Sequence, residues 1–122
     1  HHPTEIKVTL EAARQKYPDK EIVAIFLPNT YSRTEALMDE FVDVLKMADK
    51  AYIMDIHCDR ERSIDYPGVS SDTLIERVPN SEKVSLDDAD KLLKHHNSVM
   101  CFMSCTNIYV LLDKYKELLK KQ

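Results

Sequence analysis

The sequence predicts an α/β domain with a mostly parallel sheet and helices on both faces. Continuously apolar runs of strand length, at residues 22–27 (IVAIFL) and 99–103 (VMCFM), suit parallel strands that are covered on both sides. Segments with helical spacing alternate with such runs, which is typical of a parallel sheet with crossover helices. With 43% hydrophobic residues in 122, the chain is suited to one domain with its own core.

The first half of the chain predicts helix, strand and helix in turn. A helix begins near Pro3 and ends before Pro18, because proline suits a first turn and disfavours helical geometry in the residue before it. Its apolar face repeats at Ile6, Leu10, Ala13 and Tyr17. After the strand at 22–27 come a polar loop at 28–33 (PNTYSR) and a second helix. The apolar face of that helix comprises Leu37, Phe41, Val44, Leu45 and Ala48.

The second half continues the alternation. A strand at 51–56 precedes a long charged loop at 57–71, and loops of that length are often functional. Ser70 or Ser71 then caps a short helix. A weak strand at 83–86 and a short helix at 87–96 follow, with His95 and His96 as cations at the helix end. The strand at 99–103 and a long last helix complete the chain.

Polar residues follow three of the predicted strands, at 29–33, 57–62 and 104–107. Ligands of open α/β sheets bind beyond the carboxyl ends of the strands. We therefore expect these three loops to share the ligand-binding edge.

Composition excludes several function classes. The net charge of −4, with both signs mixed along the chain, argues against a general nucleic-acid binder. No apolar run approaches the length of a membrane span. The single glycine, Gly68, rules out a glycine-rich phosphate loop within these residues. Three cysteines, an odd number, favour a reducing, cytosolic compartment.

Individual residues are candidates for binding or catalysis, but none of them identifies a function by itself. Arg33, just after a strand, could bind a carboxylate or phosphate through two hydrogen bonds, or could be a solvated loop residue. The cluster of His57, Cys58 and Asp59, even with the terminal histidines, matches no standard zinc spacing, so we predict no metal site. Cys105 at a helix start could be a nucleophile, but a cysteine hydrolase would need a base such as His57 and is the weaker hypothesis.

Several segments together resemble one family. HHPTEI at 1–6, TLEAARQKYPDKEIVAIF at 9–26, PNTYSRT at 28–34 and FVDVLKMADKAYIMDI at 41–56 are similar to the C-terminal domain of the UDP-N-acetylmuramate–L-alanine ligases, in the Mur ligase family. RER at 60–62, PGVSS at 67–71 and the closing YKELL continue the resemblance in order. It covers essentially the whole chain, residues 1–122, and implies a Rossmann-like three-layer domain. It also implies that the chain is a fragment of a larger three-domain enzyme and that its first histidines are native.

The resemblance implies an ATP-dependent ligase of peptidoglycan (cell wall) synthesis in the bacterial cytoplasm. In such enzymes ATP phosphorylates the muramate carboxylate, and the amine of L-alanine attacks the acyl phosphate. UDP-N-acetylmuramate is bound by the N-terminal domain, and ATP and Mg²⁺ are bound mainly by the central domain; both domains are absent here. The C-terminal domain helps to position the amino acid and the nucleotide and is not expected to be active alone.

Carried over by position, the resemblance implies a set of substrate-binding residues and no catalytic residue. His1 is expected near the incoming amino acid, and Arg33 is expected to pair with the carboxylate of that amino acid. Tyr31, Ser32 and Thr34 complete the loop around Arg33, and Arg60 and Glu61 match an Arg-Glu pair in the next loop. The full set of predicted substrate-binding residues is His1, Asn29, Tyr31, Arg33, Arg60, Ser104 and Asn107.

Two segments depart from the pattern of the family, and both fall on predicted substrate-side loops. Leu27-Pro28-Asn29 stands where the family usually has Gln-Pro-His, and Ser104-Cys105-Thr106-Asn107 stands where it usually has Gly-Ala-Gly-Asp. Side chains in place of two glycines restrict close approach of the backbone. Three alternatives follow: a different acceptor, a related ligase that attaches a peptide to the same sugar, or a divergent non-catalytic binding or regulatory paralogue.

Overall fold

The computed structural model describes residues 2–56, 61–103 and 108–121. Within these residues, four parallel strands form one sheet in the order β3-β2-β1-β4. The strands are β1 (Glu21–Phe26), β2 (Lys50–Ile53), β3 (Ser81–Lys83) and β4 (Ser98–Met103). The α-helices are α1 (Pro3–Lys16), α2 (Tyr31–Ala36), α3 (Met38–Leu45), α4 (Ser71–Arg77) and α5 (Ile108–Lys120), and the 3₁₀ helices are η1 (Ser63–Asp65) and η2 (Leu86–Lys94).

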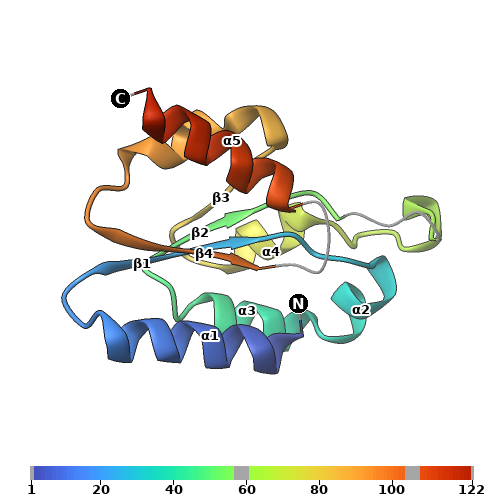
Figure 1. Ribbon diagram of the computed structural model, residues 1–122. Helices are drawn as coiled ribbons and strands as arrows, with labels where there is room; N and C mark the ends of the chain where they lie inside the picture. Colours follow the sequence, from blue (N-terminus) through green and yellow to red (C-terminus); the bar gives the residue numbers. More distant parts are fainter. Residues whose placement is uncertain (1, 57–60, 104–107, 122) are drawn as a thin grey trace.

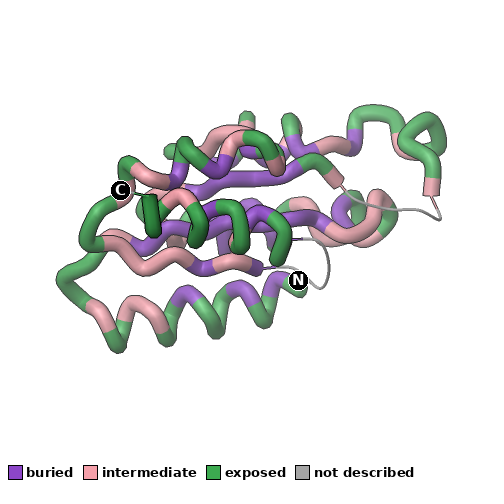
Figure 2. The backbone as a smooth tube through the Cα atoms, turned by 45° about the horizontal axis from the view of Figure 1, so that its top comes forward, coloured by how far each residue is buried: buried purple, intermediate pink, exposed green. Residues whose placement is uncertain are grey.

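Helices cover both faces of the sheet, and this confirms the predicted three-layer α/β class (Figure 1). Side chains of α1, α3 and α4 pack on one face, and side chains of η2 and α5 pack on the other. Figure 2 shows buried residues concentrated in the strands β1 and β2, with buried and exposed residues alternating along the helices α1 and α5. These helices therefore bury one apolar stripe, as their sequence spacing predicts.

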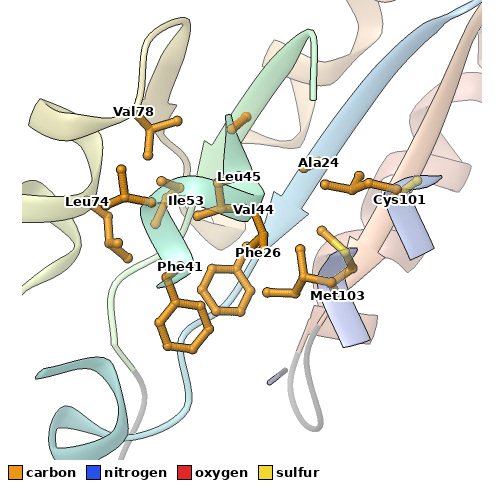
Figure 3. Packing of buried hydrophobic residues seen from close by; sticks show 14 of the residues in the cluster. Ala24, Phe26, Phe41, Val44, Leu45, Ile53, Leu74, Val78, Cys101 and Met103 are labelled. Atoms are coloured by element: carbon orange, nitrogen blue, oxygen red, sulfur yellow. The ribbon is translucent and has the colours of Figure 1, made fainter. Parts of the chain in front are cut away.

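The central strand β1 is buried on both sides. Every residue from 22 to 27 is buried, and successive side chains alternate between the two faces. Phe26 points to the α3 side, where its ring lies 5.2 Å from that of Phe41 between centroids (Figure 3). This core holds the carboxyl end of β1, and therefore the loop that follows it, in a defined position.

The predicted polar loop at 28–33 is confirmed only for residues 28–30, because α2 already begins at Tyr31. Thr30 is the N-cap of α2, and its hydroxyl accepts a hydrogen bond from the Arg33 N–H. The helix predicted to follow is interrupted at Leu37, so that α2 and α3 are separate. Local capping therefore outweighed the polar composition of the segment.

The weak third strand also differs from its prediction. It occupies Ser81–Lys83 rather than 83–86, because Ala51–Ile53 of β2 pair with these residues through the backbone. Val84 follows the strand and is buried on the side of η2 and α5. Backbone pairing, which does not depend on side-chain polarity, set this register.

His95 was predicted to be a cation at a helix end; it does occupy the C-cap position of η2, but its side chain packs against other elements. Its side chain is only 8% exposed. The ring contacts Glu21 Oε1 through Nδ1 at 2.7 Å and the Tyr52 hydroxyl through Nε2. Burial raises the pKa of Tyr52 to about 12, and its hydroxyl lies within hydrogen-bond distance of His95 Nε2, so the polar end of this buried ring has a partner.

The start of α4 is fixed differently from the predicted serine cap. Ser70 occupies the N-cap position without a capping hydrogen bond from its side chain. The buried Ser71 hydroxyl instead donates to the carbonyl oxygen of Met54, just after β2. This contact ties α4 to the carboxyl end of the sheet.

Candidate functional site

The first turn of α2 lies at the carboxyl end of β1 and is held by its own threonines (Figure 1). Thr30 Oγ1 accepts from the Arg33 N–H at 3.1 Å, and the Thr34 hydroxyl donates to the Thr30 carbonyl oxygen at 2.6 Å. Thr34 is buried, so its hydroxyl cannot rely on water. These contacts hold Tyr31, Ser32 and Arg33 in a defined helical turn.

A carboxylate from the next loop completes the cap of α2. Glu61 Oε1 accepts hydrogen bonds from the N–H groups of Tyr31 at 2.7 Å and Ser32 at 3.0 Å. A negative charge is favoured at this electropositive helix end. Hydrogen bonds from the Ser32 side chain, and then from the Ser32 and Tyr31 N–H groups, lower the pKa of the Glu61 carboxyl. Glu61 is therefore ionised at neutral pH.

Two tyrosines join the same two loops. The rings of Tyr31 and Tyr66 are stacked, with centroids 5.9 Å apart and planes at 12°. The Tyr66 hydroxyl also lies 3.4 Å from Glu61 Oε2, at the long end of hydrogen-bond distance. Loss of solvent, together with the nearby Glu61 charge, raises the pKa of Tyr66. The segment from Glu61 to Tyr66 is thus attached to α2 at both residues.

A groove of about 720 Å³ opens beside this junction. Its lining residues come from the start of α1, from α2 and from the Glu61 segment: His2, Thr30, Ser32, Arg33, Ala36, Leu37 and Glu61. His2 caps α1, where its Nδ1 accepts from the Thr4 N–H at 3.2 Å. The described lining includes the Arg33 guanidinium and an apolar wall of Ala36 and Leu37, which suit the carboxylate and the small side chain of an amino acid.

Among the described lining residues of the groove, Arg33 is the one arginine, and it is half-buried. In the described part of the chain its guanidinium has no hydrogen-bond or salt-bridge partner, although its backbone N–H is bonded to Thr30. By contrast, Arg14 and Arg77 are both engaged in ion pairs, with Asp49 and Asp39. The guanidinium of Arg33 is therefore available for a planar anion such as a carboxylate.

The sequence-predicted site residues fall into three groups. Arg33 lines the groove, and Tyr31 lies beside it as part of the junction with Glu61 and Tyr66. Asn29 is half-buried in the segment before α2 and is not among the lining residues. His1, Arg60, Ser104 and Asn107 lie outside the described residues, as do Cys58 and Cys105. Their predicted roles stay predictions.

Sequence reasoning missed part of this site. Ala36 and Leu37 gave no signal, because their role as a groove wall depends on the position of α2 relative to α1. The capping role of Thr30 did have a signal, since threonine before a helical turn is a preferred N-cap. The contact between Glu61 and α2 spans about 30 residues of sequence and leaves no local pattern.

Other classes of site lack support in the described ranges. No group of three or more His, Cys, Asp or Glu side chains there could hold a metal ion. No described helix is long and apolar enough to cross a membrane. Cys101 is buried in β4, as predicted, and burial raises the pKa of its thiol, which makes it a poor nucleophile.

Comparisons with known proteins agree with this architecture. A UDP-N-acetylmuramate–L-alanine ligase of Limosilactobacillus reuteri is 47% identical over 121 residues, which covers 98% of this chain and 27% of the relative. The crystal structure of the UDP-N-acetylmuramate–alanine ligase of Thermotoga maritima matches the fold with a TM-score of 0.72 at 20% identity, covering 99% of this chain and 25% of that one. A crystallised domain from Haemophilus ducreyi matches with a TM-score of 0.67 at 19% identity, covering 98% of this chain and 85% of that one.

The chain spans about a quarter of the length of the curated relatives it matches. A family model, described as the glutamate ligase domain of Mur ligases, matches residues 1–101. This match covers most of the chain and includes the whole of the groove, from His2 to Glu61. The chain therefore belongs to the Mur ligase family, in its glutamate ligase domain.

Proposed function

We propose that the chain is the C-terminal domain of an ATP-dependent ligase that joins L-alanine to UDP-N-acetylmuramate in peptidoglycan synthesis. The observation that carries this proposal is the 47% identity to a relative of that name across almost the whole chain. The groove beside Arg33 adds a physical argument, because its chemistry suits a small amino acid.

In this proposal Arg33 binds the carboxylate of the amino acid. Its planar guanidinium can donate two parallel hydrogen bonds to a carboxylate, and it is not neutralised by another described side chain. Ala36 and Leu37 offer apolar contact suited to a methyl side chain. The amine is then left free to attack the activated sugar carboxylate, which forms the amide bond.

The described residues contain no cluster of metal-ligating side chains, and the whole chain has one glycine, Gly68, on the exposed loop before α4. The family resemblance, rather than this observation, implies that ATP and Mg²⁺ are bound mainly outside this chain. The N-terminal and central domains implied by the family resemblance would supply those sites, and a cytoplasmic location for the enzyme belongs to the same proposal.

The identity of the acceptor is the least constrained part of the proposal. The altered LPN segment ends at Asn29, which is half-buried beside the groove-forming turn. The altered SCTN segment at 104–107 lies outside the described residues. A shift of acceptor from alanine to another amino acid, or to a peptide, would leave the binding of a carboxylate by Arg33 unchanged.

The test is a ligation assay with the longer protein that carries this chain. ATP and UDP-N-acetylmuramate are offered with a panel of single amino acids and with short peptides, while phosphate release and amide product are both measured. We expect L-alanine to give the highest kcat/KM. The 122-residue chain alone serves as the control and should release no phosphate.

Three results would contradict the proposal. Preference for another acceptor would refute the alanine assignment, and turnover by the isolated chain would refute the division of labour between domains. Binding of substrates without any ligation would favour the non-catalytic paralogue.

A further inference from the structure

Among the described residues, Glu61 contributes to the groove lining from the segment between β2 and α4, and it reaches across to the start of α2. We propose that Glu61 is a positioning residue that holds the first turn of α2 and thereby presents Arg33 to the amino acid. The inference rests on the proposed function of the groove, and it adds a residue whose role is exerted through Arg33.

The hydrogen bonds of the first turn carry this inference. The first N–H groups of a helix have no partner within the helix. In α2 the first three N–H groups donate to side-chain oxygens instead: those of Tyr31 and Ser32 donate to Glu61, and that of Arg33 donates to Thr30. Without Glu61, two of these three anchors are lost. A six-residue helix is too short to be stable by itself, so its geometry depends on such contacts.

The same contacts explain why Glu61 does not neutralise Arg33, although both line one groove. The Oε1 atom accepts two backbone hydrogen bonds, and Oε2 faces the Tyr66 hydroxyl. No ion pair joins Glu61 to Arg33 in the described residues, where Glu61 contacts Tyr31, Ser32 and Tyr66. The carboxylate is thus used to fix the backbone, and the guanidinium remains available for a substrate.

Glu61 is also a poor candidate for the base that accepts a proton from the attacking amine. The hydrogen bonds from Ser32 and Tyr31 lower the pKa of its carboxyl, which weakens it as a base. Its role should therefore be visible in substrate binding rather than in the chemical step.

The first experiment measures amino-acid kinetics in the longer protein for the variants E61A, E61Q, R33A and the double variant R33A/E61A. E76A is the matched control, because Glu76 is an exposed glutamate on α4 outside the groove. We expect E61A to raise the KM for the amino acid about five- to tenfold, with kcat changed less than about twofold. E61Q, which keeps an acceptor but not the charge, should lie between E61A and the parent.

The double variant separates positioning from direct binding. If Glu61 acts through Arg33, then E61A should change the KM of the R33A protein by less than about twofold, because coupled residues are not additive. The proposal would be overturned if the fold-increase in KM of the double variant, relative to the parent, equals the product of the fold-increases of the two single variants. An unchanged KM in E61A, or a loss confined to kcat, would also overturn it.

A second experiment tests the contact itself in the 122-residue chain, without any activity. The amides of Tyr31 and Ser32 should exchange with solvent at least about tenfold faster in E61A than in the parent or in E76A, while amides of β1 keep their protection. Equal exchange in E61A and the parent would overturn the proposal. If the longer protein ligates nothing, the proposed function fails, whereas slow exchange that depends on Glu61 would still demonstrate the contact.

Discussion

Replacing Arg33 by alanine removes the guanidinium that the described residues contribute to the groove lining. The substitution should leave the helix intact, because the contacts that form the first turn involve the Arg33 backbone N–H and the side chains of Thr30, Thr34 and Glu61. Alanine is also the best helix former. The change therefore isolates the interaction between the Arg33 side chain and the amino acid.

The size of the effect follows from the hydrogen bonds that would be lost. Hydrogen bonds to a charged group contribute about 1.5–3 kcal/mol. The groove is open to solvent and Arg33 is only half-buried, so the lower end of that range, about 1.5–2 kcal/mol, is appropriate. At about 1.4 kcal/mol for each factor of ten, the KM for the amino acid should rise about 10- to 30-fold.

The assay is steady-state ligation by the longer protein, with the amino acid varied and the other substrates saturating. R77A is the control, because Arg77 forms an exposed ion pair with Asp39 away from the groove. R33K should be intermediate, since lysine keeps the charge but not the planar pair of donors. A KM for R33A within twofold of the parent, or a fall in kcat alone, would refute the assignment of Arg33 to the carboxylate.

Three further predictions concern the scaffold, each measured by urea unfolding of the chain. L74A should lower the free energy of unfolding by about 2–5 kcal/mol, because Leu74 is fully buried; a loss below about 1 kcal/mol would contradict the described packing. The hydrogen bond from the Ile22 N–H lowers the pKa of Asp49, so ionised Asp49 stabilises the fold. Near pH 7 the free energy of unfolding of the parent should therefore exceed that of D49N by about 1 kcal/mol, and this difference should disappear as the pH falls below about 4. A difference that does not change with pH would refute the ionic contribution. Y52F removes the hydroxyl that contacts His95 and should lower the free energy of unfolding by about 1 kcal/mol; an unchanged stability would show that the hydroxyl contact contributes nothing.

Much of the architecture could be predicted from local patterns. The spacing of Ile6 and Leu10 and the apolar run at 22–27 report directly on burial, because a helix or strand that packs on one core must repeat its apolar residues at the period of that element. The errors came where another force outweighed the pattern. Thr30 initiated a helix in a polar segment, and pairing with β2 moved the third strand.

The groove could be predicted only in part. Arg33 was identified from its place after a strand and from its resemblance to a known motif, and the structure places it in the lining of the groove. The contact of Glu61 with the Tyr31 and Ser32 amides was not predicted, because it joins loops that follow different strands. The contacts of His95 with Tyr52 and Glu21 likewise were not predicted, because the three residues come from separate parts of the chain.

The sequence by itself therefore determined the α/β class, the alternation of helices and strands, the family and the position of Arg33 after a strand. These properties depend on composition, periodicity and neighbouring residues, all of which are local. Only the tertiary structure decided that the Glu61 segment caps α2, that His2 and Leu37 complete the groove, and that Arg33 has no ionic partner among the described residues. Those properties depend on distances between segments far apart in the chain, and a parallel sheet sets these distances by bringing the ends of separate strands to one edge.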